Sequence, residues 1–220
     1  MPWKLALKTT MPTYGEFQGM DKLYFMEEIE VKFLDINPEK IQEKLKDIGA
    51  EKQGEYFYRR RIFDYPDLRL DKEGAWIRLR DEGNKITLAF KKRIGIKAHD
   101  GKYSDSGMKE IEIEVSDFDK TGLLLEQLGF IEKFYQENKR IRWVKGDIEF
   151  DIDFWPKLNP YLEIEAPSWD KIDKAILLLG LDKKDKKIFS TQQVYRLKGI
   201  NEIDYQKMTF GGFVKKKDNS

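Results

Sequence analysis

Short stretches in which polar and apolar residues alternate dominate the chain from Met26 onward. In the first of them, Ile29, Val31 and Phe33 alternate with charged residues. A period of two is typical of a β-strand with one apolar and one polar face. Seven more segments share this alternation, so the sequence predicts eight strands, over 28–33, 56–64, 75–80, 85–92, 109–115, 139–144, 147–154 and 161–165.

Helical spacing of apolar residues occurs between the strands. Asn37 and Pro38 supply an N-cap and a first-turn proline for a helix that ends at Gly49. Leu124, Leu125 and Leu128 belong to the apolar side of a second helix, and we expect them to face inward. The further helices are predicted over 119–128, 168–179 and 190–197.

The length of 220 residues favours one main domain. We expect an N-terminal extension over 1–25, a domain over 26–200 and a C-terminal tail over 201–220 that is disordered from Gly211. Most linkers between predicted strands are short, which favours antiparallel pairing, and the exception is a long loop over 94–108.

Composition narrows the possible chemistry. The absence of Cys excludes disulfides, thiolate nucleophiles and Cys-ligated zinc, so oxygen atoms must hold any metal. The single His99 has no partner at metal-ligand spacing and is interpreted as a plain loop residue. Charged residues make up 37% of the chain, yet the net charge is only +1, which gives no argument for nucleic acid or membrane binding. No apolar run approaches the roughly 20 residues of a membrane span, and the cytoplasm is the expected location.

The charged faces of the strands are sorted into acidic and basic rows. Glu110, Glu112 and Glu114 share one face, whereas Arg140 and Arg142 share another. Such rows repel unless opposite charge or a bound ion lies across from them. If the apolar faces pack under helices, the charged faces line the interior of a closed eight-stranded antiparallel β-barrel in an α+β fold. The cations available there to bind a polyphosphate are Lys32, Arg78, Arg80, Lys91, Arg140 and Arg142. The carboxylates would reach the phosphates through Mg²⁺ or Mn²⁺.

At these residues the sequence resembles the CYTH family, also called triphosphate tunnel metalloenzymes, over about residues 26–198. The family groups class IV adenylyl cyclases, thiamine triphosphatases and inorganic or RNA triphosphatases. Its N-terminal signature Glu-x-Glu-x-Lys stands here as Glu28-Ile29-Glu30-Val31-Lys32. The other matching elements are Trp76-Ile77-Arg78-Leu79-Arg80, the strand ending at Lys91, Glu110-Ile111-Glu112-Ile113-Glu114, Arg140-Ile141-Arg142, Ile152-Asp153-Phe154-Trp155-Pro156 and Tyr161-Leu162-Glu163-Ile164-Glu165.

The resemblance implies an eight-stranded tunnel in which the six cations grip a triphosphate. It implies that one or two Mg²⁺ or Mn²⁺ ions are held by Glu28, Glu30, Glu112, Asp153, Glu163 and Glu165. Glu28, Glu30 and Lys32 are the residues expected to act in catalysis. Phosphoryl transfer asks mainly for positioning and charge neutralisation, which fits a site without a Ser, Cys or His nucleophile. Glu110, Glu114, Glu149 and Asp151 are weaker candidates that could only balance charge.

One segment departs from the family pattern. Arg59, Arg60 and Arg61 stand where many relatives carry an acidic residue ahead of Tyr-Phe-Asp. An exposed strand edge and a role in substrate binding remain equally open for them.

Three functions follow from this reading. The first is metal-dependent hydrolysis of a nucleoside triphosphate, thiamine triphosphate or inorganic tripolyphosphate. The second is cyclisation of ATP to cAMP and pyrophosphate in the same site, and the third is a non-catalytic polyphosphate or nucleotide-binding module. The expected partner is a small-molecule triphosphate, not a nucleic acid or a membrane, and monomer and homodimer both remain open.

Overall fold

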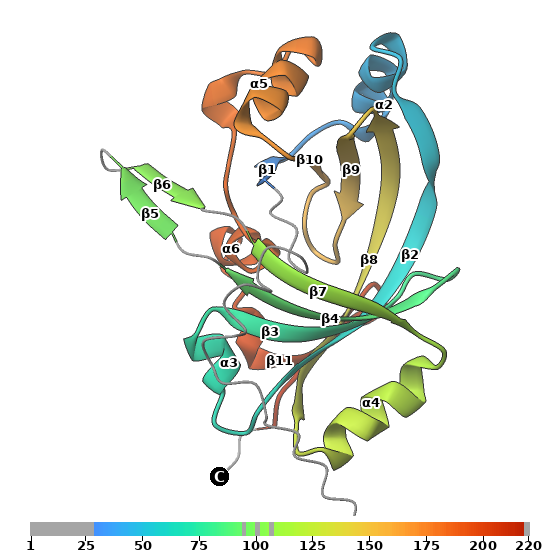
Figure 1. Ribbon diagram of the computed structural model, residues 1–220, viewed down its shortest axis with the longest axis vertical. Coiled ribbons are helices and arrows are strands. Elements are labelled where there is room, and N and C mark those ends of the chain that lie inside the picture. The colour runs from blue at the N-terminus through green and yellow to red at the C-terminus, as the bar shows by residue number, and fades with distance from the viewer. Residues whose placement is uncertain (1–28, 94–95, 100–101, 106–107, 218–220) are drawn as a thin grey trace, which may run out of the picture.

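The computed structural model describes residues 29–93, 96–99, 102–105 and 108–217, with side chains described for 29–93 and 109–217. It combines β-strands with shorter helices (Figure 1). The elements in chain order are β1 (Ile29–Phe33), α2 (Pro38–Asp47), β2 (Glu51–Asp64), α3 (Arg69–Lys72), β3 (Ala75–Asp81), β4 (Ile86–Arg93), β5 (Ile96–His99), β6 (Lys102–Asp105), β7 (Met108–Val115), α4 (Phe118–Gln127), β8 (Ile131–Lys145), β9 (Ile148–Phe154), β10 (Tyr161–Ala166), α5 (Trp169–Leu178), the 3-10 turn η2 (Lys183–Asp185), α6 (Thr191–Leu197), the 3-10 turn η3 (Glu202–Asp204), β11 (Tyr205–Thr209) and β12 (Gly212–Lys215).

One strongly curved sheet organises the molecule. Its strands follow the order β1-β10-β9-β8-β2-β3-β4-β7, and every neighbouring pair along this path is antiparallel. These eight strands are the eight that the alternation predicts. The long strands β2 and β8 run through both halves of the sheet (Figure 1). The α+β class and the antiparallel pairing are therefore confirmed.

The prediction of a closed eight-stranded barrel is wrong. The sheet contains ten strands, because β11 pairs with β8 and β12 pairs with β11. Within the described residues, no ladder joins β1 to β7, the two ends of the path. The outer edge of β1 is instead occupied by a later segment, since Lys32 and Lys187 exchange two backbone hydrogen bonds of 2.8 and 2.9 Å. A strand edge that is already paired cannot close a barrel.

The helices α2 and α5 cover the outer face of one half of the sheet, at the end of the molecule opposite α4 (Figure 1). Both begin at capping side chains that accept a backbone hydrogen bond, Asn37 from the N–H of Lys40 and Ser168 from that of Lys171. Their apolar sides join the outward residues of β1, β8, β9 and β10 in the largest core cluster. This packing leaves the charged side of the same strands on the inside of the curve.

The helix α4 meets the sheet through Leu125, as predicted, but not through Leu124 or Leu128. It begins one residue earlier, at Phe118 after the N-cap Asp117, and its buried residues are Phe118, Gly122 and Leu125. Leu124 and Leu128 are 58% and 64% exposed, so they do not face inward. Phe118, Gly122 and Leu125 are spaced as i, i+4 and i+7 and form the stripe that faces the sheet. Leu124 and Leu128 lie off this stripe and therefore stay exposed.

Two further segments differ from expectation. Residues 94–108, expected as a loop, contain the hairpin of β5 and β6 with His99 at the end of β5. Residues 212–215, expected to be disordered, form β12, which pairs with β11. The hairpin of β11 and β12 forms because Met208 and Phe213 pack with Trp155 and Tyr195. These C-terminal residues complete a small apolar cluster.

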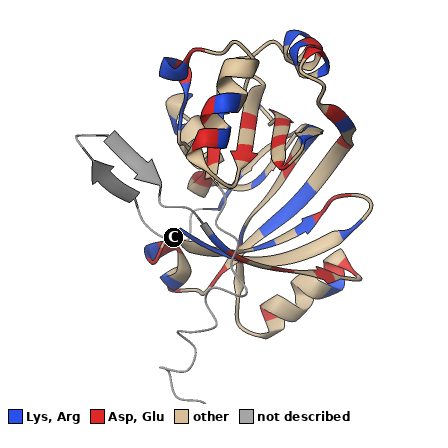
Figure 2. Ribbon diagram, turned by 45° about the horizontal axis from the view of Figure 1, so that its top comes forward, with Lys and Arg blue, Asp and Glu red and all other residues tan. Residues whose placement is uncertain are grey.

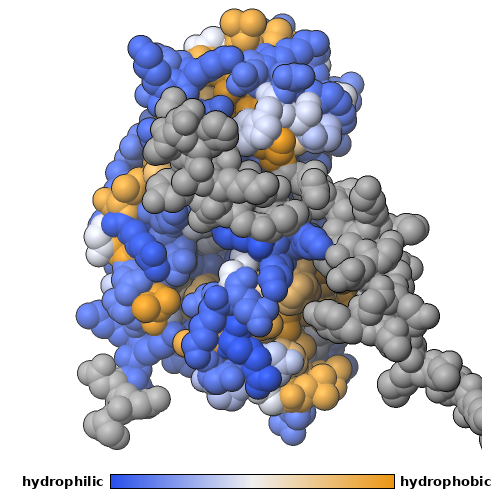
Figure 3. All heavy atoms as spheres, turned by 60° about the vertical axis from the view of Figure 1, so that its left-hand side comes forward, coloured by the Kyte–Doolittle hydropathy of each residue, from blue (hydrophilic) through white to orange (hydrophobic). Residues whose placement is uncertain are grey.

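No helix in the described part of the chain has the length and apolar composition of a membrane-spanning segment. The face drawn in Figure 3 is mostly hydrophilic, with its apolar residues in small separate groups.

Candidate active site

The register of the sheet places the predicted site residues within the described part of the chain on one face. Glu163 of β10 lies opposite Lys32 of β1 and Asp151 of β9, and Asp151 lies opposite Arg142 of β8. In the other half, Arg78 of β3 and Glu112 of β7 flank Ala89 of β4. Because this face is the inner face of the curve, the predicted inward orientation of the charges follows from pairing alone.

Strands β1, β9 and β10 form a wall rich in carboxylates, which we call the acidic wall and define as Glu30, Glu149, Asp151, Asp153, Glu163 and Glu165. Arg140 of β8 binds three of these carboxylates, with distances of 2.6 Å to Asp153 and 3.2 Å to Glu163. Arg142 donates to Asp151 at 2.8 and 2.9 Å. Two arginines therefore hold the acidic wall from the side of β8.

Strands β3 and β4 form a wall rich in cations, the basic wall, defined as Arg78, Arg80 and Lys91. Arg78 contacts Glu110 at 3.0 Å and Glu112 at 2.9 Å, both from β7. Lys91 contacts Glu110 at 2.7 Å. The Nε atoms of Arg60, Arg78 and Arg80 are buried and have no hydrogen-bond partner among the described residues. The basic wall thus retains unused donors, which is what an anion site requires.

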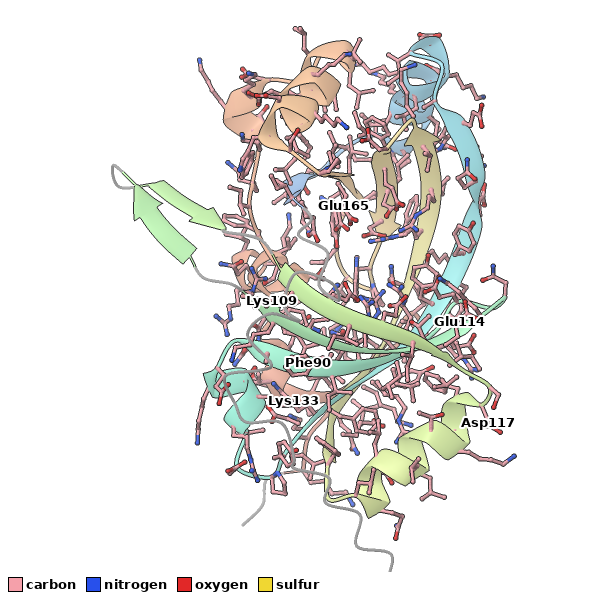
Figure 4. The ribbon with its side chains drawn as sticks, in the orientation of Figure 1. Phe90, Lys109, Glu114, Asp117, Lys133 and Glu165 are labelled. Carbon is pink, nitrogen blue, oxygen red and sulfur yellow. The ribbon has the colours of Figure 1, made fainter. Side chains whose placement is uncertain are left out.

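The two walls face each other across the curve. Arg80 of the basic wall and Arg140 beside the acidic wall lie over the same ring, that of Tyr58, at 5.2 and 5.9 Å from its centre. Figure 2 shows acidic residues banded on the strands of one half and basic residues along the strands beneath them. In Figure 4, Glu165 lies on the inside of the curve, whereas Phe90 belongs to the opposite face of β4. The inner face therefore offers carboxylates on one side and cations on the other.

Three carboxylates of the acidic wall converge closely enough to hold one metal ion. An oxygen of each of Glu30, Glu163 and Glu165 lies within 4.8 Å of the others. The set fits a hard divalent cation such as Mg²⁺ or Mn²⁺, because it offers oxygen ligands alone and carries negative charge. Lys32 pairs with Glu30 and lies 2.9 Å from Glu163, so one cation already balances part of this group.

Two carboxylates of the acidic wall have opposite pKa shifts, because neighbouring cations dominate at Glu163 and burial dominates at Asp153, whose pKa is raised. Burial raises the pKa of Glu163, but the charges of Lys32 and Arg140 outweigh burial and lower this pKa to about 2. For Asp153, burial raises the pKa and the charge of Arg140 opposes it. Glu163 is therefore a carboxylate at neutral pH, as a metal ligand must be.

The structure distributes the predicted site residues unevenly. Glu30, Glu163 and Glu165 come together, but Asp153 lies against Arg140 and Glu112 against Arg78. Glu28 falls outside the described residues. Of the weaker candidates, Asp151 lies centrally between Arg140 and Arg142, while Glu110 pairs with Lys91 and Arg78.

Arg60 was not among the predicted site residues. The run of three arginines alternates: Arg59 pairs outward with Asp81 and Arg61 with Glu126 and Glu132, whereas Arg60 points to the inner face. Tyr58 and Arg60 are two residues apart in the strand, so their side chains lie on the same face of the sheet. The run of three arginines alone does not reveal which of them faces inward.

The family model described as "CYTH domain" matches residues 26–190. No curated protein matches this chain. Among solved structures, a Pyrococcus horikoshii protein is 23% identical with a TM-score of 0.61, covering 76% of this chain and 98% of that one. A candidate adenylate cyclase from Vibrio parahaemolyticus is 16% identical with a TM-score of 0.62, covering 78% and 98%. A candidate adenylyl cyclase from Hippeastrum, described as having a dominant triphosphatase activity, is 16% identical with a TM-score of 0.55, covering 81% and 99%.

The fold and its two charged walls define a protein of the triphosphate tunnel class, here with an incompletely closed sheet. Because the family model covers most of the sequence, the chain belongs to the CYTH domain family. The solved structures, at these low identities, establish the shared fold.

Proposed function

We propose that this protein is a metal-dependent enzyme that binds a triphosphate on the inner face of its sheet and hydrolyses a phosphate bond there. The observation that carries the proposal is the opposition of an acidic wall and a basic wall across one curved sheet. A polyphosphate would be attracted by the basic wall, and a divalent cation held by Glu30, Glu163 and Glu165 would offset its repulsion by the carboxylates. The proposed catalytic domain spans residues 26–200.

The proposed site residues fall into metal ligands and phosphate ligands. Glu30, Glu163 and Glu165 would hold the first divalent ion, and Glu28, Glu112 and Asp153 are the proposed remaining ligands. When bound, the ion neutralises phosphate charge and activates the attacking water. The guanidinium groups of Arg78 and Arg80 donate paired hydrogen bonds to phosphate oxygens and orient the triphosphate for in-line attack by water.

The proposed phosphate ligands also include Lys32, Lys91, Arg140 and Arg142. The donors of Arg140 and Arg142 are already engaged with Asp151 and its neighbours, so these two contribute chiefly by fixing the acidic wall. Lys91 and Arg78 share Glu110, and a bound phosphate would draw both cations toward itself.

Arg80→Ala should raise the KM for the triphosphate by about 10- to 100-fold, because it removes a forked charge-assisted contact. Steady-state kinetics with tripolyphosphate at fixed Mg²⁺ measures this change. Lys120→Ala, which removes an exposed cation of α4 that pairs with Asp117, is the matched control and should leave KM unchanged. An unaltered KM in the Arg80 variant would remove Arg80 from the binding site.

The kcat/KM for the triphosphate should fall by roughly tenfold per pH unit above about pH 8. Burial and the charge of Arg78 lower the pKa of Lys91 to about 8, against the opposing effect of Glu110. Above that pH the amine is neutral and no longer attracts phosphate. Lys91→Arg should keep kcat/KM flat to at least pH 9, and identical pH profiles for the two proteins would exclude this role for Lys91.

Analysis of the products formed from ATP separates hydrolysis from cyclisation. Hydrolysis releases orthophosphate, whereas cyclisation releases cAMP and pyrophosphate. We expect orthophosphate, which is in keeping with the triphosphatase activity described for the Hippeastrum neighbour. Detection of cAMP would instead show that the protein is an adenylyl cyclase. Metal-dependent binding of ATP without any product would favour a non-catalytic nucleotide-binding module.

A further inference from the structure

Three guanidinium groups converge on one buried tyrosine. Arg60, Arg80 and Arg140 lie over the ring of Tyr58 at 5.9, 5.2 and 5.9 Å from its centre. Arg60 and Arg80 are directly opposite each other on neighbouring strands. Like charges in that position destabilise a sheet unless an anion lies between them. The arrangement is therefore stabilised by negative charge close to these arginines, and Arg60 is the one of the three without a paired carboxylate among the described residues.

Arg60 differs from the other two arginines in its partners. Arg80 pairs with Glu82, and Arg140 pairs with three carboxylates of the acidic wall. Arg60 forms no ion pair within the described part of the chain, and it donates a hydrogen bond to the amide oxygen of Asn138. Burial and the charges of Arg80, Arg78 and Arg140 lower the pKa of Arg60 to about 9, against the opposing charge of Asp153. The direct partner of this buried guanidinium is thus a neutral amide, while the carboxylates of Asp153 and Glu202 act on it without a direct pair, so an added anion would stabilise it.

The surroundings of Arg60 fix it in place and leave donors available. Its guanidinium stacks on the ring of Trp155 at 4.6 Å. The indole Nε1 of Trp155, which is 4% exposed, has no hydrogen-bond partner among the described residues, and the same holds for the buried Nε of Arg60 and of Arg80. The three unpartnered N–H donors therefore belong to Arg60, to its cross-strand neighbour Arg80 and to the indole on which Arg60 stacks, and an oxyanion bound beside Arg60 would give them a partner.

The C-terminal segment closes the sheet behind this point. Gln136, the cross-strand neighbour of Arg60, donates a 2.9 Å hydrogen bond to Glu202 of η3. Trp155 packs edge-to-face on Tyr195 of α6. Because Arg60 covers one face of the Trp155 ring, a nucleobase cannot stack on that face.

We propose that Arg60, together with Arg80 and the indole N–H of Trp155, binds a phosphoryl group additional to the three held by the predicted triphosphate ligands. The preferred substrate is then a linear polyphosphate with at least four phosphoryl groups. This inference rests on the proposed function, since it extends the same basic wall by one subsite. Arg60 is a specificity-determining residue in this scheme, and it is not needed to bind the first three phosphates.

The test is isothermal titration calorimetry of the full chain with tripolyphosphate and with linear tetrapolyphosphate, both in EDTA so that no metal-dependent turnover occurs. Wild-type protein should bind the tetrapolyphosphate about tenfold more tightly, the size of one charge-assisted contact. Arg60→Gln should abolish this preference while changing the affinity for tripolyphosphate by less than about threefold. Arg59→Gln, on the same strand but paired outward with Asp81, is the matched control and should behave as wild type.

Equal affinities of wild-type protein for the two ligands would overturn the proposal, as would a failure to bind either. An equal loss of affinity for both in Arg60→Gln would make Arg60 an ordinary triphosphate ligand instead. If Arg60→Gln does not fold, Arg60→Lys is measured in its place and should lower the preference to about threefold, because lysine keeps the charge but not the fork. A preference that stays tenfold in Arg60→Lys contradicts the inference. Phosphate release from tripolyphosphate with metal is a separate readout, so the subsite can fail while the hydrolase stands.

Discussion

Glu30→Gln should lower the metal-dependent kcat by about 100-fold or more while the protein still unfolds cooperatively. Glu30 supplies one of the three carboxylates that converge within 4.8 Å, and glutamine keeps the shape but removes the negative charge that a divalent cation needs. A 100-fold loss corresponds to about 2.7 kcal/mol of transition-state stabilisation. Manganese affinity, measured by electron paramagnetic resonance, should fall in parallel.

The matched control for this prediction is Glu55→Gln. Glu55 is an exposed glutamate of β2 that pairs with Lys52 away from the inner face. Its variant should retain wild-type turnover and wild-type manganese affinity. Full activity or unchanged metal binding in Glu30→Gln would show that the cluster of Glu30, Glu163 and Glu165 is not the metal site.

Arg140→Met should reduce the free energy of unfolding by about 3–5 kcal/mol at pH 8. Arg140 is 8% exposed and pairs with Asp151, Asp153 and Glu163, so its loss leaves buried carboxylates without their principal partner. Without Arg140, the largest effect opposing burial at Asp153 is lost, and the pKa of this carboxyl rises further above its unfolded value. A raised folded pKa destabilises the protein as pH rises, so the deficit should be smaller at pH 5 than at pH 8.

Guanidinium unfolding curves at the two pH values measure this effect. Arg69→Met is the control, because Arg69 forms an exposed pair with Asp67 and its loss should change the unfolding free energy by less than about 1 kcal/mol. A deficit below about 1 kcal/mol for Arg140→Met at pH 8 would mean that the acidic wall does not depend on this arginine.

The strands and the inward direction of the charges could be predicted from sequence because both depend on local periodicity. In a strand the side chains alternate, so Glu163 and Glu165 must share a face once Leu162 and Ile164 pack under α5. The helix starts at Pro38 and Trp169 followed from their capping residues for the same reason.

Closure of the sheet could not be predicted, because it depends on contacts between residues far apart in the chain. The bridge from Lys32 to Lys187 that occupies the edge of β1 has no sequence signature. The hairpin of β11 and β12 likewise exists through packing of Met208 and Phe213 on the cluster around Trp155, and its own sequence is too polar to indicate it.

The candidate site was predictable in its residue types and less so in its groupings. Alternation placed Arg78, Arg80 and Lys91 on one face, but only the register reveals that Glu112 sits among these cations while Glu30 joins Glu163 and Glu165. The role of Arg60 could not be predicted, because neighbouring arginines in a strand point to opposite faces and the sequence does not show which face is the inner one. The structure shows that Arg60 faces inward, whereas Arg59 and Arg61 face outward.

The most direct test of the central claim is phosphorus NMR of the purified protein with tripolyphosphate, in the presence of Mg²⁺ or Mn²⁺ and in EDTA. The account predicts that orthophosphate and pyrophosphate signals grow with either metal and that the tripolyphosphate spectrum stays unchanged in EDTA. Tripolyphosphate that persists with both metals, together with ATP that persists under the same conditions, would contradict the assignment of the two walls to phosphate-bond hydrolysis.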